Sequence, residues 1–123
     1  MLFRSQHVRT SRQGIVAPEL RYLDRGSSRA YLPDVSVLLA GRVPEEALAG
    51  GPVEVPPDLA IEVLSPDDRT GEVLEKVGFY LRVGVPLVWV VDPEPETLTA
   101  FRDRKSTRLN SSHIQKSRMP SSA

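Results

Sequence analysis

Residues 56–76 read PPDLAIEVLSPDDRTGEVLEK, and this stretch decides the fold. Its first part, 59–64, is a short and nearly continuous apolar run, which is typical of a central strand buried on both faces. Turn residues follow, and from 70 to 83 apolar side chains recur at helical spacing up to a stop signal at Gly84. A second buried strand is predicted over 86–91. Strand, helix and strand in this order predict a βαβ unit with a right-handed crossover.

Glu62 lies at the centre of the first apolar run. A buried carboxylate is costly unless it is paired, protonated or bound to a metal ion. Asp34 follows Pro33 at the start of an earlier predicted strand, and pairing of the two strands would bring both carboxylates to one edge of the sheet. Such a pair suits a hard divalent cation such as Mg²⁺. The alternative is a buried acid that is paired with an arginine such as Arg29 or Arg69.

Lys76 is the only lysine of residues 1–102, where the ten other basic residues are arginines. On a helical wheel it lies at the border of the apolar face, one turn before Tyr80. From there its ammonium group can extend toward the edge of the sheet and reach a phosphate. The alternative is a surface ion pair with Glu72, which precedes it by four residues. We expect the Tyr80 ring to belong to the core.

The rest of the chain shows shorter patterns. The predicted elements are two antiparallel strands of a hairpin at 15–23 and 30–39, one helical turn at 45–48 and the start of a returning strand at 98–102. The segment 1–14 is polar and unpatterned, and we expect a loop there. Residues 15–102 are therefore predicted to form a partial domain.

The last twenty-one residues differ from the rest in composition. Residues 103–113, DRKSTRLNSSH, resemble the translation of a standard sequencing-library adapter, and SRMPSSA at 117–123 matches a later part of that adapter in another frame. These residues are rich in Ser, Lys and Arg and show no helical or strand period. We expect 103–123 to be a non-native, adapter-derived and disordered tail.

Charge and composition exclude several classes of protein. Without the tail, residues 31–102 carry thirteen acidic and five basic residues, and an acidic centre does not attract nucleic acid by itself but suits divalent cations. The chain has no cysteine, so disulfides and thiolate metal sites are excluded. It shows neither a membrane span nor the apolar middle of a signal peptide. We expect a soluble cytoplasmic protein.

A set of short motifs gives the chain a family resemblance. They are LPDV at 32–35, DLAIEVLSP at 58–66, Lys76, Tyr80, GVP at 84–86 and WVVDP at 89–93. In this order and spacing they resemble the bacterial Uma-type restriction endonucleases of the PD-(D/E)xK nuclease superfamily. The resemblance covers roughly residues 15–102.

The resemblance implies a restriction-endonuclease-like mixed α/β sheet and an endonuclease that hydrolyses DNA phosphodiester bonds with Mg²⁺ or Mn²⁺. It implies Asp34 and Glu62 as metal ligands and, with Lys76, as catalytic residues. One departure is Leu64, which stands where the superfamily normally has its lysine. We expect a fragment that is inactive as it stands. A homodimer is left open, as is a non-catalytic nuclease-fold protein that binds DNA or a protein partner.

Overall fold

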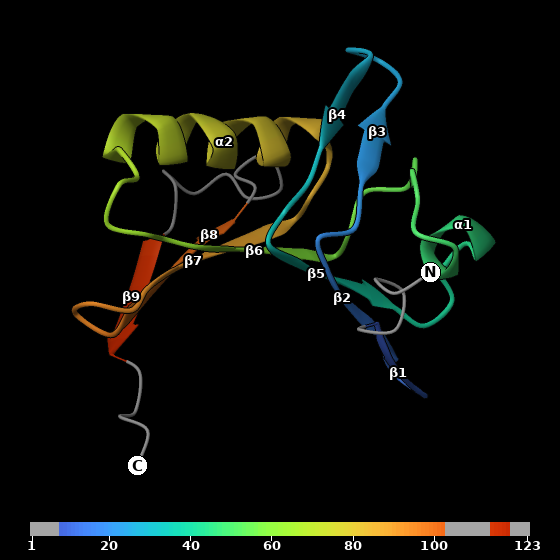
Figure 1. The fold of residues 1–123 in the computed structure, drawn as a ribbon, viewed down its shortest axis with the longest axis horizontal. Coiled ribbons are helices and arrows are strands. Elements are labelled where there is room, and N and C mark those ends of the chain that lie inside the picture. Colours follow the sequence, from blue (N-terminus) through green and yellow to red (C-terminus); the bar gives the residue numbers. More distant parts are fainter. Residues whose placement is uncertain (1–7, 103–113, 119–123) are drawn as a thin grey trace. The chain divides into compact units, whose positions relative to one another are not determined.

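The computed structural model describes residues 8–102 and the backbone of residues 114–118. It confirms a mixed α/β fold, and the chain divides into two compact units, residues 1–60 and 61–123. The elements, labelled in Figure 1, are β1 (Arg9–Ser11), β2 (Gly14–Pro18), β3 (Tyr22–Asp24), β4 (Arg29–Tyr31), β5 (Val35–Leu39), α1 (Glu45–Leu48), β6 (Leu59–Val63), α2 (Thr70–Val83), β7 (Leu87–Asp92), β8 (Thr97–Arg102) and β9 (Ile114–Arg118).

The first unit contains the predicted hairpin, with each arm divided in two. β2 and β5 pair antiparallel, and β3 and β4 form a separate two-stranded antiparallel sheet beyond them. The first arm is interrupted after Pro18, which has no N–H group for a strand ladder, and Glu19 there adopts a left-handed φ of 49°. The second arm is interrupted at 32–34. The single long strands predicted at 15–23 and 30–39 are therefore wrong in their middle parts.

The N-terminal segment is a second correction. Residues 9–11 form β1, which pairs antiparallel with β2, where the sequence analysis expects a loop. All three of its residues are exposed. An edge strand of this kind is held by backbone hydrogen bonds, so it needs no alternating apolar pattern and gives no periodic signal.

Tyr22 and Ser36 form a buried polar contact in the first unit. Their hydroxyl oxygens lie 2.6 Å apart, and both residues are almost fully buried. The Tyr22 ring stacks on Tyr31 with centroids 5.3 Å apart. Burial raises the pKa of Tyr22 to about 12. Because the fold favours the neutral phenol, this contribution to stability is complete below about pH 10 and is lost as the pH rises through about 12.

We expect Tyr22→Phe to lower the free energy of unfolding by about 1–3 kcal/mol, because it leaves the buried Ser36 hydroxyl without its partner. Ser36→Ala should cost a similar amount for the converse reason. The double variant should cost clearly less than the sum, since both polar groups are then gone. Urea titration of the four proteins measures the coupling, and additivity within about 0.5 kcal/mol would show that the hydroxyl contact is energetically unimportant.

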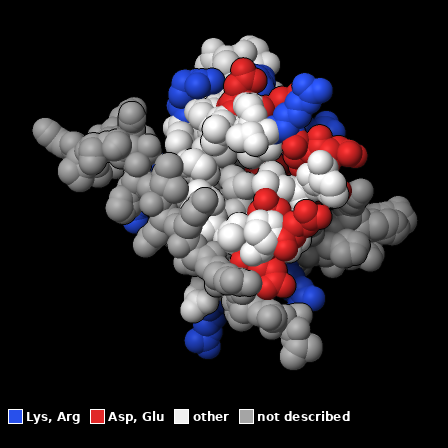
Figure 2. Space-filling view, turned by 90° about the vertical axis from the view of Figure 1, so that its left-hand side faces the viewer, with Lys and Arg blue, Asp and Glu red and all other residues white. Residues whose placement is uncertain are grey.

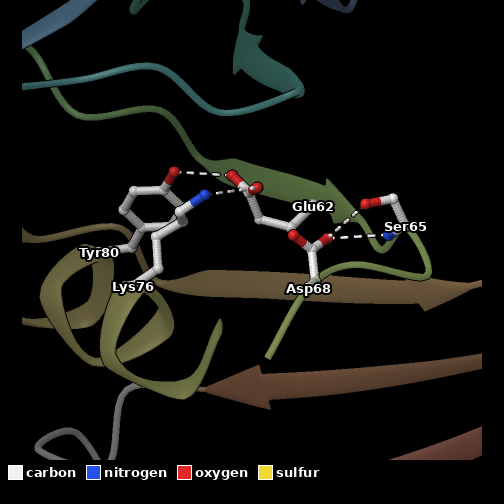
Figure 3. A network of polar contacts seen from close by, with 5 residues as sticks. All are labelled: Glu62, Ser65, Asp68, Lys76 and Tyr80. Carbon is white, nitrogen blue, oxygen red and sulfur yellow. Dashed lines mark hydrogen bonds and ion pairs between the residues drawn. The ribbon is translucent and has the colours of Figure 1, made fainter. Parts of the chain in front are cut away.

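The second unit contains the predicted βαβ unit. Its strands lie in the order β6, β7, β8, β9, and the arrows of β6 and β7 point the same way (Figure 3). The Leu64 N–H donates to the Val91 carbonyl at 2.8 Å, which fixes the ends of the two parallel strands together. Figure 1 shows α2 lying across one face of this part of the sheet. The predicted strand over 86–91 therefore lies beside the strand over 59–64, as expected.

Helix α2 has the bounds that the sequence predicts, Thr70–Val83. It ends because Gly84 adopts a left-handed φ of 111°, which turns the chain so that the Gly84 and Val85 N–H groups bond to the Leu81 and Tyr80 carbonyls. Val77, Phe79 and Tyr80 are its buried residues. In the part of the chain that the structure describes, no helix is long and apolar enough to cross a membrane.

The structure also differs from the expectation of a disordered tail. Residues 114–118 form β9, which pairs antiparallel with β8. The outer edge of β8 presents unpaired N–H and C=O groups, and any extended segment can satisfy them whatever its side chains. This explains how a strand forms without a strand period. Residues 103–113 and 119–123 lie outside the described residues, and the adapter origin of the tail stays a prediction.

Candidate functional site

The site begins with Glu62, which lies in the middle of β6. Alternate residues of β6 are buried, and Glu62 shares the buried set with Ala60. Only 5% of Glu62 is exposed, although its neighbours in sequence are aliphatic. The strand therefore places a carboxylate where the pattern of the rest of the element favours an apolar side chain. Such a group needs partners, because an ionised carboxylate loses its hydration on burial.

Helix α2 supplies two partners (Figure 3). The Tyr80 hydroxyl donates a hydrogen bond of 2.7 Å to Oε2 of Glu62, and this contact is buried. The Lys76 ammonium lies 3.4 Å from Oε1 and forms an ion pair with it. Lys76 and Tyr80 are one helical turn apart, so both side chains project from the same face of α2 toward β6. Each oxygen of the carboxylate thus has its own donor.

Lys76 contacts the buried carboxylate rather than Glu72. The alternative of a surface pair with Glu72 is therefore wrong, because the Lys76 ion pair is made with Glu62. The two partners differ in exposure: the Lys76 side chain is 51% exposed and the Glu62 side chain 7%. Solvent can reach the ammonium group, so Lys76 can exchange Glu62 for another anion at little desolvation cost.

A small pocket of about 90 Å³ opens beside this pair. Its lining residues are Glu62, Val63, Leu64, Asp68, Glu72, Val73 and Lys76. Asp68 accepts hydrogen bonds from the Ser65 N–H at 2.8 Å and the Ser65 hydroxyl at 3.3 Å, which fixes the turn between β6 and α2 (Figure 3). The pocket has room for a few water molecules or a hydrated ion.

Asp34 lies in the first unit, immediately before β5. It is partly buried, and its carbonyl accepts the Glu19 N–H at 3.0 Å. The approach of Asp34 to Glu62, which the resemblance implies, stays a prediction. Of the three expected site residues, the second unit brings Glu62 and Lys76 together, as expected.

The expected place of the Tyr80 ring in the core is confirmed, whereas the contact of its hydroxyl with Glu62 was not predicted from the sequence. The ring is buried, and the hydroxyl is also bonded to Glu62. One signal could have shown this: Tyr80 follows Lys76 by four residues, so whatever Lys76 reaches from α2 is also near Tyr80.

The donor groups fit a hard divalent cation. They are carboxylate oxygens, which Mg²⁺ prefers, and the chain has no thiolate. Within residues 8–102, no three His, Asp or Glu side chains are grouped closely enough to hold a metal ion by themselves. Mg²⁺ is usually held by one or two carboxylates together with water and substrate phosphates. The residues therefore fit a Mg²⁺ ion that is completed by water and substrate, not an all-protein cage.

Up to residue 102, the second unit carries more acidic than basic residues. Residues 61–102 contain eight acidic and four basic residues. Figure 2 views the side on which α2 begins and the β7–β8 turn lies, and it shows acidic and basic groups intermixed in the upper part of this face and mainly carboxylate groups below them. Such a surface attracts cations and repels the phosphates of DNA.

Comparisons with known proteins show the family and the fold of the chain. The model of the Uma2 family, described as "Putative restriction endonuclease", matches residues 2–122, a range that includes most of the tail. A crystal structure of a putative nuclease belonging to DUF820, from Anabaena variabilis ATCC 29413, is similar with a TM-score of 0.66 and 26% identity. The match covers 84% of this chain and 55% of that one, so the chain spans about half the length of that protein. No curated protein matches the chain.

Proposed function

Because the chain belongs to the Uma2 family of putative restriction endonucleases, we propose that it is the metal-binding part of a Mg²⁺-dependent endonuclease that hydrolyses DNA phosphodiester bonds. One observation carries the proposal: a buried carboxylate, Glu62, lies beside a half-exposed ammonium, Lys76, at a pocket. This pairing offers a ligand for a cation and a group for a phosphate in one place.

Glu62 and Lys76 have different roles in this proposal. Glu62 is held by α2 and presents a fixed negative charge at the pocket. Lys76 is the mobile partner, and on arrival of DNA its ammonium moves from Oε1 to a phosphate oxygen, where it neutralises charge that develops during cleavage. When bound, Mg²⁺ would supply Lewis-acid activation of the phosphate and lower the pKa of an attacking water.

Asp34 is proposed as the second carboxylate ligand. This follows from the family resemblance of LPDV at 32–35. A single carboxylate holds Mg²⁺ weakly, so a second carboxylate ligand would account for a usable affinity.

The test is thermal melting of the full chain with Mg²⁺ or with EDTA, together with nicking of supercoiled plasmid DNA. A ligand at ten times its Kd stabilises the folded state by about 1.4 kcal/mol, which corresponds to several degrees in Tm. We expect this shift for the wild type and its loss in Asp34→Asn, while the exposed control Asp67→Asn keeps it. A shift that survives Asp34→Asn removes Asp34 from the site.

The competing function is a non-catalytic nuclease fold that binds DNA or a protein partner. One observation favours it: Leu64 stands where the superfamily normally has its lysine. A chain that is folded by circular dichroism but shows neither the Mg²⁺ shift nor nicking would establish this alternative.

A further inference from the structure

We propose that Tyr80 is a positioning residue that orients the Glu62 carboxylate for cation binding through its hydroxyl group. The inference rests on the proposed function, which it deepens by assigning a role to a residue outside the expected set of Asp34, Glu62 and Lys76. Tyr80 touches neither the cation nor the substrate in this role.

The geometry of the hydrogen bond carries the inference. The Tyr80 hydroxyl lies 2.7 Å from Oε2 of Glu62, and Tyr80 is 1% exposed. A short O–H···O⁻ contact out of reach of solvent is among the stronger hydrogen bonds in proteins. It joins the middle of β6 to the last turns of α2, two elements that the sheet and the core already hold in place. The carboxylate therefore has one oxygen whose position is fixed.

The two oxygens of Glu62 differ in their surroundings. Oε2 is bonded to a buried phenol, whereas Oε1 faces Lys76, which is half exposed and lines the pocket. Fixing Oε2 on the buried side sets the plane of the carboxylate and leaves Oε1 as the oxygen that a cation from the pocket meets. Hydrogen bonds to the outer side of a metal ligand typically change metal affinity or activity by about 10- to 100-fold.

The Tyr80 side chain does more than fill space in the core. Phenylalanine would occupy the same volume, so the hydroxyl adds only its hydrogen bond, and a buried hydroxyl without one is costly. The Phe79 ring, 6.3 Å from the Tyr80 ring, already provides aromatic packing on the same helix. Tyr80 differs from Phe79 because its hydroxyl contacts the buried carboxylate of Glu62.

The test compares Tyr80→Phe with the matched control Tyr22→Phe. Both variants remove one buried phenol oxygen, but the Tyr22 hydroxyl pairs with Ser36. Metal-free melts first establish the loss of stability in each. Melting across a Mg²⁺ titration then gives the Mg²⁺ concentration at half-maximal shift, and plasmid nicking gives kcat and KM. We expect Tyr80→Phe to raise that Mg²⁺ concentration about tenfold or more and to lower kcat, with KM for DNA unchanged. Tyr22→Phe should change neither.

Each other outcome has a definite meaning. If Tyr80→Phe matches Tyr22→Phe in its Mg²⁺ response, the hydroxyl is purely structural and the inference is wrong, while the proposed function stands. A Tyr80→Phe variant that fails to fold leads to the same conclusion. If the folded wild type shows no Mg²⁺ response, the proposed function fails and the positioning role fails with it.

Discussion

Replacement of Glu62 by glutamine is expected to remove the stabilisation of the chain by Mg²⁺ and to reduce any Mg²⁺-dependent DNA cleavage that the chain retains by at least about 100-fold. The amide keeps the shape of the side chain and still accepts the hydrogen bond from Tyr80, but it lacks the negative charge that a cation requires. Loss of a hydrogen-bond partner of a metal ligand lowers metal affinity or activity by about 10- to 100-fold. Loss of the ligand itself should therefore lower them by at least about 100-fold.

The same variant should behave differently in metal-free unfolding. A buried ion pair contributes little to the free energy of unfolding. Removal of one member lowers that free energy mainly when the other charge is left buried without a partner. Here the remaining charge belongs to Lys76, which is 51% exposed and stays hydrated. We expect the free energy of unfolding without metal to be unchanged within about 1 kcal/mol, or higher.

Glu75→Gln is the matched control, because Glu75 is an exposed carboxylate of α2 that does not line the pocket. It should leave cleavage and the Mg²⁺ response as they are. Circular dichroism melts and plasmid nicking should be measured on the wild type, Glu62→Gln and Glu75→Gln. Retention of both the Mg²⁺ response and cleavage in Glu62→Gln would place the site elsewhere in the chain.

Replacement of Lys76 by alanine is expected to lower cleavage by about 100-fold while Mg²⁺ binding is kept or strengthened. The ammonium lies 3.4 Å from the oxygen that would face the cation, so its removal takes away a competing positive charge. Cleavage falls because no group remains to neutralise charge on the reacting phosphate. Opposite changes in two readouts distinguish a substrate-binding lysine from a structural ion pair.

Arg82→Ala removes the other cation of α2 and serves as the control for a general loss of positive charge. Lys76→Arg is a second useful comparison, because the guanidinium is larger and planar and cannot reproduce a compact point charge. If Lys76→Ala cleaves DNA as well as the wild type does, the Lys76–Glu62 pair is a static ion pair and the catalytic assignment of Lys76 is wrong.

The parts of the fold that could be predicted from the sequence are those in which burial imposes a pattern. Helix α2 has an apolar face and a glycine stop, so its bounds are as predicted. β6 and β7 have alternate residues buried and the others mostly half-buried, and both show up as apolar runs. Glu62 could be identified because it interrupts such a run, and Lys76 because it is the only lysine among arginines.

The parts that could not be predicted depend on backbone pairing or on contacts between elements. β1 and β9 form strands although their sequences show no strand pattern. The break after Pro18 depends on a single left-handed residue, Glu19. Tyr80 has the same spacing as a core residue, and its hydroxyl bond to Glu62 becomes visible only when α2 is placed on β6.

The pairing of β9 on the edge of β8 has a consequence for how such chains diverge. Main-chain hydrogen bonds do not depend on which side chains the added strand carries, so one closing segment can replace another without loss of the ladder. We therefore expect the sheet to tolerate insertions, deletions and frame changes after residue 102 more readily than changes in β6 or α2. The C-terminal side of this fold is the place where unrelated sequence can be joined during evolution or in protein engineering.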